Sequence, residues 1–262
     1  MEYKTILTEV RDAVLIITLN RPEAKNAINS RMWAEMQDAL EIWDADDNQR
    51  VVIVTNTGDV FCAGADLKEL AEGTWHGPEG KPDWGCGAFT KHFFAKPIIC
   101  AVRGKALGGG VELVAAADLA LASEDAIFGL PEPLVGLTAA GGGALIRLAQ
   151  QIPLKFANEL LLTSNPISAD TAQKWGLINH VVNDADVMDK ALQMANDIVR
   201  GAPLSIACTK QTVYETMSES SIYPSLGWQR LEEIEKITRN SQDALEGARA
   251  FAEKRKPHWK GC

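Results

Sequence analysis

The sequence is poor in the residues that build metal sites and disulfide frameworks. Its 262 residues include only five cysteines and four histidines. The histidines are scattered, and no two cysteines have the CxxC spacing of a zinc or redox motif. An odd number of cysteines without that spacing is typical of reduced thiols in a cytoplasmic protein. We therefore expect no metal site and no disulfide among the cysteines, which are Cys62, Cys86, Cys100, Cys208 and Cys262.

An excess of positive charge and long apolar runs are also absent. The 26 lysines and arginines against 35 aspartates and glutamates give a net charge of −9, which argues against a nucleic-acid partner. No run approaches the ~18 apolar residues that a membrane span needs. The first residues contain no basic segment followed by an apolar one, so we expect no signal peptide and a cytoplasmic location.

Ample apolar material remains for a folded core. Hydrophobic residues make up 46% of the chain and charged residues 23%, as in soluble globular proteins. Hydrophobic patterning predicts strands at 3–10, 13–19, 51–55, 98–102, 119–122, 126–128 and 178–182. It predicts helices at 31–46 after an N-cap at Ser30, then from Asp66 to about 70, at about 110–117, 144–150, 154–163, 169–175, 186–200, 204–219, 225–239 and 242–256. The fold class is therefore α/β, with a core at 1–200 and a helical region at 201–262.

One glycine-rich stretch carries the strongest chemical signal. Residues 105–118 place Gly108, Gly109 and Gly110 directly before an apolar helix that contains Glu112. Glycines allow the backbone to approach a ligand closely, and a helix start offers unpaired N–H groups with partial positive charge. A carboxylate in such a helix is costly to bury unless it is paired or used. A plain turn or packing role remains the alternative for the three glycines.

Two further segments have similar features. Residues 61–70 pass from small residues into a short helix capped by Asp66, a second place where backbone N–H groups can face a ligand. Glu132 lies between Pro131 and Pro133, which hold its backbone at a defined place, although an exposed loop glutamate is the simpler interpretation. Residues 72–88, rich in glycine, proline and tryptophan, predict a mobile surface loop with a functional role.

Four separated segments together resemble the crotonase family, also called the enoyl-CoA hydratase/isomerase superfamily, over essentially the whole chain. They are Asn20-Arg21-Pro22 with Asn26-Ala27, Phe61 with residues 63–68 (AGADLK), residues 106–113 (ALGGGVEL) and residues 128–132 (FGLPE). The resemblance implies a spiral of ββα units and a helical C-terminal region that packs in trimers, often paired into hexamers. Residues 243–255 and 259–261 resemble the tail of carnitinyl-CoA dehydratases within that family.

The resemblance also implies roles for particular residues. Ala65 and Gly109 match the two backbone N–H donors of an oxyanion hole, and Glu112 and Glu132 match the two acidic residues of hydratases. The segments that line the path of coenzyme A contain Lys25, Ala63, Asp66, Leu67 and Lys68. In the last helix, Phe251 and Lys254 match positions that reach a CoA bound mainly by a neighbouring subunit. Coenzyme A arrives as part of the substrate, so no separate cofactor is implied.

The chemistry expected from this set is addition of water to a 2-enoyl-CoA. A thioester carbonyl gathers negative charge when its α-carbon becomes enolate-like, which two fixed N–H donors stabilise. We expect Glu112 to orient and activate the water and Glu132 to deliver the proton, with the roles exchanging between directions. The pair of glutamates favours a hydratase over an isomerase, a thioester hydrolase or another lyase of the same family.

One departure from the family pattern bears on the substrate. Relatives have Gly-x-x-Pro-x-x-Gly-Gly after the second glutamate, whereas residues 136–143 contain no proline and are one residue longer. The sequence therefore does not identify the acyl group of the substrate. We expect Trp75, Trp84 and Phe89 to determine which acyl group the pocket accepts. A carnitinyl-CoA dehydratase and a non-catalytic acyl-CoA binder are the remaining alternatives, and a dinucleotide site is excluded because residues 108–110 lack the GxGxxG spacing.

Overall fold

The computed structural model describes residues 3–217, 233, 235–237 and 240–262, apart from the side chains of residues 248, 251 and 252. The chain forms two compact units. The first contains Met1–Phe94 and Ile98–Ala195, and the second contains Ala95–Pro97 and Asn196–Cys262. The predicted division at residue 200 into a core and an oligomerisation region stays a prediction.

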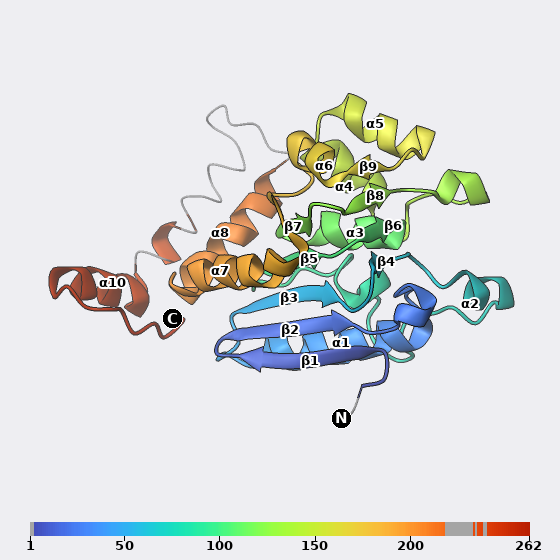
Figure 1. Cartoon of the computed structure of the whole chain (residues 1–262). Helices are drawn as coiled ribbons and strands as arrows, with labels where there is room; N and C mark the ends of the chain where they lie inside the picture. The colour runs from blue at the N-terminus through green and yellow to red at the C-terminus, as the bar shows by residue number, and fades with distance from the viewer. Residues whose placement is uncertain (1–2, 218–232, 234, 238–239) are drawn as a thin grey trace. The chain divides into compact units, whose positions relative to one another are not determined.

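A six-stranded sheet forms the centre of the first unit, with the strand order β1-β2-β3-β5-β7-β10 (Figure 1). Its strands are β1 Ile6–Arg11, β2 Val14–Leu19, β3 Val51–Asn56, β5 Ile98–Val102, β7 Leu119–Ser123 and β10 His180–Val182. The pair β1 and β2 is antiparallel, and every other neighbouring pair is parallel. All six residues of β3 are buried, as expected for a parallel strand covered on both faces.

A second, four-stranded sheet has the order β4-β6-β8-β9. Its strands are β4 Val60–Cys62, β6 Lys105–Leu107, β8 Ile127–Gly129 and β9 Ile167–Ser168. The chain passes three times from a strand of the large sheet to a strand of the small sheet and then to a helix, as β3-β4-α2, β5-β6-α3 and β7-β8-α4. This confirms the predicted α/β class and gives the ββα repeat that the family resemblance implies.

The helices occupy most of the predicted positions. They are α1 Ser30–Ala45, α2 Leu67–Glu72, α3 Gly109–Ala116, α4 Ala144–Gln151, α5 Leu154–Thr163, α6 Ala169–Trp175, α7 Val187–Val199, α8 Pro203–Thr216 and α10 Gln242–Ala252. Short 3₁₀ turns are η1 Pro22–Ala24, η2 Cys86–Ala88, η3 Glu132–Val135 and η4 Asp184–Asp186. The predicted helix at 225–239 lies for the most part outside the described residues. None of the helices in the described ranges is long and apolar enough to cross a bilayer.

Several local predictions are wrong in detail. The N-cap of α1 is Asn29, whose side chain accepts from the Met32 N–H at 2.9 Å, while the Ser30 hydroxyl donates to Glu69 instead. The strands β4 and β6 were not predicted, because pairing with strands from other parts of the chain defines them. The predicted surface loop at 72–88 turns inward at its end, where all three residues of η2 are buried.

The core of the first unit lies between the sheets and the helices. Helix α1 packs against β1 and β2 through its apolar face. The largest fully buried side chains there include Trp43, Phe61, Phe94 and Phe128. This packing holds β4, β6 and β8 in place, and the segments that build the candidate site follow directly from these three strands.

In the second unit, the last residues of the chain fold back onto α10. Asp243 is 1% exposed and accepts the backbone N–H groups of Lys260 (2.7 Å) and Gly261 (3.0 Å). The N–H of Gln242 donates in turn to the carbonyl oxygen of Cys262 at 2.7 Å. The Trp259 indole N–H donates to the carbonyl of Arg200 at 2.8 Å. These bonds fix the tail along the start of α10.

Candidate active site

A cavity of about 300 Å³ opens in the first unit where the turns after β4, β6 and β8 meet. Its lining residues are Ala63, Gly64, Ala65, Leu67, Leu70, Trp75, Cys86, Gly108, Gly109, Glu112, Pro131, Glu132, Val135, Leu137, Thr138 and Gly141. The cavity thus brings together the two predicted glutamates, the two predicted oxyanion positions and two of the residues predicted along the CoA path. Those segments are far apart in the sequence, and the ββα repeat is what joins them.

Glycines are needed where the first two turns touch. Gly64 has a φ of +94°, and a Cβ on it would lie 3.0 Å from the backbone nitrogen of Gly109. A Cβ on Gly109 would in turn lie 3.2 Å from the Cα of Gly64. The turns at 63–65 and 108–110 are therefore in direct backbone contact, which a larger residue at either position would prevent. This contact brings Ala65 and Gly109 side by side.

The backbone N–H groups of Ala65 and Gly109 have no acceptor among the residues that the structure describes. A parallel bridge joins Ile28 to Ala65 through bonds from Ile28 N–H to Gly64 O and from Asp66 N–H to Ile28 O, which leaves the Ala65 N–H out. Gly109 is the first residue of α3, so its N–H has no intrahelical acceptor. Throughout the described ranges, neither N–H donates a hydrogen bond. Two adjacent donors therefore line the cavity.

Glu112 lies on α3, one turn after Gly109, and is only 4% exposed. Its Oε1 accepts the backbone N–H of Ala144, the first residue of α4, at 3.3 Å. The unpaired N–H groups and the dipole of a helix start attract a carboxylate. Gly142 lies directly against the glutamate, because a Cβ on Gly142 would come 2.6 Å from that of Glu112. The glycine turn before α4 therefore forms the seat of this side chain.

Glu132 begins η3 directly after Pro131, and its carboxyl group faces Gly108. Burial raises the pKa of Glu132, and the nearby charge of Glu112 adds to the effect. Its Oε2 is buried and has no hydrogen-bond partner among the described residues. A buried carboxyl oxygen without a protein partner is uncommon in folded proteins and is consistent with a functional role. The two glutamates therefore differ: the carboxylate of Glu112 accepts from a helix start, and the pKa of Glu132 is raised.

Three residues predicted along the CoA path do not line the cavity. The Asp66 side chain caps α2 by accepting the Lys68 N–H and pairs with Arg21 at 3.1 Å, so it has a structural role. The carbonyl of Lys25 accepts the Ala63 N–H at 3.1 Å, and the backbone of Lys25 is left-handed, with a φ of +53°. Contact of Lys25, Asp66 or Lys68 with coenzyme A stays a prediction.

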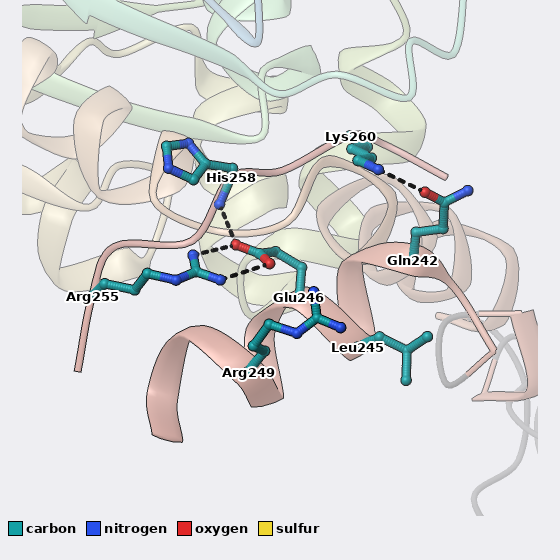
Figure 2. Close-up of a pocket in the computed structure, with 7 residues that line it drawn as sticks. All are labelled: Gln242, Leu245, Glu246, Arg249, Arg255, His258 and Lys260. Carbon is teal, nitrogen blue, oxygen red and sulfur yellow. Dashed lines mark hydrogen bonds and ion pairs between the residues drawn. The ribbon is translucent and has the colours of Figure 1, made fainter. Parts of the chain in front are cut away.

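The remaining predicted residues lie on the last helix and the segment after it. The side chain of Phe251 lies outside the described residues, and Lys254 is exposed with a φ of +54°. A separate cavity of about 350 Å³ occurs in the second unit, and Figure 2 shows the residues that line it. They are Gln242, Leu245, Glu246, Arg249, Arg255, His258 and Lys260. Neither predicted residue is among them, so their contact with CoA also stays a prediction.

Glu246 organises that second cavity. Its carboxylate accepts two bonds from the Arg255 guanidinium (2.6 and 3.0 Å) and one from the His258 backbone N–H at 2.8 Å (Figure 2). These bonds lower the pKa of Glu246 to about 2. The Lys260 ammonium group donates to the side-chain oxygen of Gln242 at 3.1 Å. The ion pair between Glu246 and Arg255 therefore borders the cavity and links the tail to α10.

Among the three aromatic residues predicted to set the acyl group, only Trp75 lines the main cavity. Its indole N–H donates to the carbonyl of Ile28 at 2.8 Å. Trp84 stacks on His92 with ring centroids 4.0 Å apart, and Phe89 is buried in the core. Cys86 also lines the cavity and was not among the predicted site residues; burial raises the pKa of its thiol. No motif marks Cys86, and only the inward turn at η2 brings it to the cavity wall.

Metal-ligating side chains do not gather elsewhere in the described part of the chain. Histidine, cysteine, aspartate and glutamate form no group of three or more there that could hold a metal ion. All five cysteines are free thiols, and four of them are buried.

Comparisons with known proteins agree with this geometry. A model of the family described as enoyl-CoA hydratase/isomerase matches residues 9–262. A carnitinyl-CoA dehydratase of Proteus mirabilis is 42% identical over 258 residues, which cover 96% of each chain. The crystal structure of an enoyl-CoA hydratase from Mycobacterium tuberculosis superposes with a TM-score of 0.90 at 40% identity, covering 98% of this chain and 99% of that one.

A carnitinyl-CoA dehydratase structure from Mycobacterium avium is 43% identical, with a TM-score of 0.78 over 98% of this chain and 99% of its own. The match to the family model spans nearly the whole sequence, and the Mycobacterium tuberculosis structure covers 98% of this chain. The chain, with two glutamates and two backbone donors around one cavity, therefore belongs to the enoyl-CoA hydratase/isomerase family and has the crotonase fold.

Proposed function

We propose that this protein is an enoyl-CoA hydratase, which adds water reversibly across the C2–C3 double bond of a 2-enoyl-CoA thioester. One observation carries the proposal: Glu112 and Glu132 line the same cavity as Ala65 and Gly109, whose N–H groups have no acceptor among the described residues. Hydration needs these two kinds of group together, because it moves two protons and builds negative charge on the thioester oxygen.

The residues of the cavity can account for each bond and each proton of this reaction. The water oxygen bonds to C3, and the proton that it loses goes to the carboxylate of Glu112. The electron pair of the double bond moves toward the thioester oxygen, where the N–H groups of Ala65 and Gly109 stabilise the charge. C2 then takes a proton from Glu132. Return of a proton from Glu112 to Glu132 by way of solvent resets the site, and the same steps in reverse remove water.

The environments of the two glutamates support this division of roles. Burial and the charge of Glu112 raise the pKa of Glu132, which favours the protonated form that an acid needs. The Oε1 of Glu112 accepts the Ala144 N–H, so its position and orientation are fixed. A carboxylate held in this way can align a water molecule for attack at C3.

The test is hydration of crotonyl-CoA, followed by loss of the enoyl-thioester absorbance. Wild type is compared with Glu132→Gln and Glu112→Gln, which keep the shape of each side chain and remove its proton chemistry. We expect each variant to lower kcat by about 10²–10⁴-fold. The Kd for butyryl-CoA, which has no double bond, serves as the control and stays within about threefold. Turnover by both variants at the rate of wild type contradicts the proposal.

A carnitinyl-CoA dehydratase is the second candidate, and one observation favours it. The relatives of that name are 40–42% identical over about 95% of this chain. The substrate then carries a trimethylammonium group, for which Trp75 offers the one aromatic ring among the described residues that line the cavity. The ratio of kcat/KM for crotonobetainyl-CoA to that for crotonyl-CoA decides between the two. Release of free CoA instead indicates a hydrolase, and a product in which the double bond has moved indicates an isomerase.

We also propose that the protein acts as a homotrimer or as a hexamer built from two trimers, in the cytoplasm, with residues 201–262 forming the subunit contacts. In this arrangement Phe251 and Lys254 approach the CoA of a neighbouring subunit, while Lys25, Asp66 and Lys68 border the CoA of their own subunit. Native mass spectrometry gives the subunit number. Full activity after dialysis against a chelator supports a reaction that needs no metal.

A further inference from the structure

Arg147 on α4 joins two segments that border the main cavity. Its guanidinium donates from Nη1 to the carbonyl of Gly142 at 2.7 Å and from Nη2 to the carbonyl of Thr90 at 2.6 Å. The side chain is half-buried and does not itself line the cavity. A planar guanidinium holds two acceptors in a fixed geometry, which a flexible ammonium group cannot do. Arg147 therefore sets the spacing between the two carbonyls.

The first of these contacts reaches Glu112. Gly142 and Glu112 are so close that a Cβ on Gly142 would lie 2.9 Å from the carboxyl carbon. The same turn leads into Ala144, whose N–H donates to Oε1 of Glu112. A shift of the Gly142 carbonyl thus moves both the wall and the donor that hold the glutamate. Arg147 controls that carbonyl directly.

The second contact reaches another segment of the cavity lining. Thr90 is buried, and its hydroxyl donates to the carbonyl of Cys86 at 3.1 Å. Cys86 lines the cavity. The guanidinium therefore ties the seat of Glu112 to the segment that carries Cys86, across more than fifty residues of sequence.

We propose that Arg147 is a positioning residue for the hydration reaction: it holds Glu112 at the angle needed to activate water by clamping the turn at Gly142 to the segment at Thr90. This inference rests on the proposed function and deepens it. Displacement of a reacting group by about 1 Å costs on the order of 10²-fold in rate. The clamp is therefore expected to act on kcat more than on the binding of the thioester.

The test is a double-mutant cycle on crotonyl-CoA hydration with Arg147→Met and Glu112→Gln. We expect Arg147→Met alone to lower kcat by about 10–100-fold, with a smaller change in KM. In the Glu112→Gln background the same substitution lowers kcat by less than about threefold, because the group it positions is already lost. Arg147→Lys restores part of kcat. Equal losses in both backgrounds overturn the proposal.

Two controls separate positioning from general damage. Arg103→Met removes an arginine whose guanidinium donates to Asp184 and which is not among the residues that line the cavity. We expect it to keep kcat within about twofold. The melting temperature of Arg147→Met is measured at the same time, and a protein that is unfolded at the assay temperature is replaced by Arg147→Lys in the cycle.

A second readout does not depend on turnover. Cys86 and Cys100 are both buried, so the rate at which a maleimide labels each one, followed by peptide mass spectrometry, reports local opening. Arg147→Met is expected to raise labelling of Cys86 at least tenfold and to leave Cys100 unchanged. Unchanged labelling of Cys86 overturns the clamp. A wild type that hydrates no enoyl-CoA overturns the proposed function instead, while the labelling still shows whether Arg147 holds the two segments together.

Discussion

Gly142 lies against Glu112 with no room for a side chain between them: a Cβ on Gly142 would come 2.6 Å from the Cβ of Glu112 and 3.0 Å from its Oε2. Real Cβ atoms do not approach so closely, so Gly142→Ala forces either the glutamate or the turn to move. We expect kcat for crotonyl-CoA to fall by about 10–100-fold, because the carboxylate leaves the position from which it activates water.

Gly141→Ala is the matched comparison for that variant. A Cβ on Gly141 meets only the Oε2 of Glu112, at 3.8 Å, which is ordinary van der Waals contact. The two substitutions add the same methyl group at neighbouring positions of one turn. We expect Gly142→Ala to lose at least ten times more activity than Gly141→Ala. Similar losses for both would mean that the turn, rather than the seat of Glu112, is sensitive.

The raised pKa of Glu132 predicts a pH-dependent difference in stability. A carboxyl group whose pKa is higher in the folded than in the unfolded protein stabilises the fold at low pH, and this contribution is lost as the pH rises through the folded pKa. Glu132→Gln cannot ionise, so it avoids that loss. We expect the variant to gain stability relative to wild type as the pH is raised from about 4.5 to 8, measured by urea unfolding.

Glu79→Gln provides the control, since Glu79 is exposed on the surface. Its free energy of unfolding relative to wild type is expected to change little over the same pH range. If Glu132→Gln is less stable than wild type at pH 8 and equal to it at pH 4.5, the burial of Glu132 does not oppose ionisation. A gain for Glu132→Gln together with a loss of turnover would show that stability is given up for catalysis at this position.

The ion pair between Arg21 and Asp66, next to the turn that contains Ala65, is expected to contribute to the free energy of unfolding. The two side chains are 17% and 12% exposed and 3.1 Å apart, and Arg21 also donates to the carbonyl of Ala27 at 2.6 Å. Arg21→Met leaves the carboxylate of Asp66 without its cation. We expect a loss of about 1.5–3 kcal/mol in the free energy of unfolding. Arg11→Met, which removes an exposed pair with Glu9, is expected to change it much less, because solvent screens the charges of a surface pair.

Four residues of the cavity could be predicted because the family resemblance assigns a role to each of them. Local sequence alone marked the glycine turn with Glu112, whereas it favoured an exposed loop position for Glu132. The structure brings all four to one cavity. Their chemical roles stay predictions until the variants are measured.

The residues that support this set could not be predicted in the same way. Arg147 acts through a contact with Thr90, which lies more than fifty positions earlier in the chain, and Thr90 in turn bonds the backbone of Cys86. Short strands such as β4 and β6 escaped notice for a related reason, since partners from other parts of the chain define them. A cap such as Asn29 was missed by one residue, because Ser30 has the same local preference.

The anchoring of the last residues by Asp243 gives the final prediction. This carboxylate is almost fully buried and accepts the backbone N–H groups of Lys260 and Gly261. Asp243→Ala removes both acceptors at once. We expect the amides of Lys260 and Gly261 to exchange with solvent deuterium at least tenfold faster in the variant, as measured by mass spectrometry or NMR.

Glu253→Ala is the matched control for the tail, because Glu253 is exposed and, among the described residues, its carboxylate accepts only from the Arg255 side chain. It should leave exchange at Lys260 and Gly261 unchanged. Because the Gln242 N–H also donates to the carbonyl of Cys262, exchange that stays slow in Asp243→Ala would place the anchor on that bond instead. Fast exchange in Asp243→Ala, but not in the control, means that one buried carboxylate holds the tail against the start of α10.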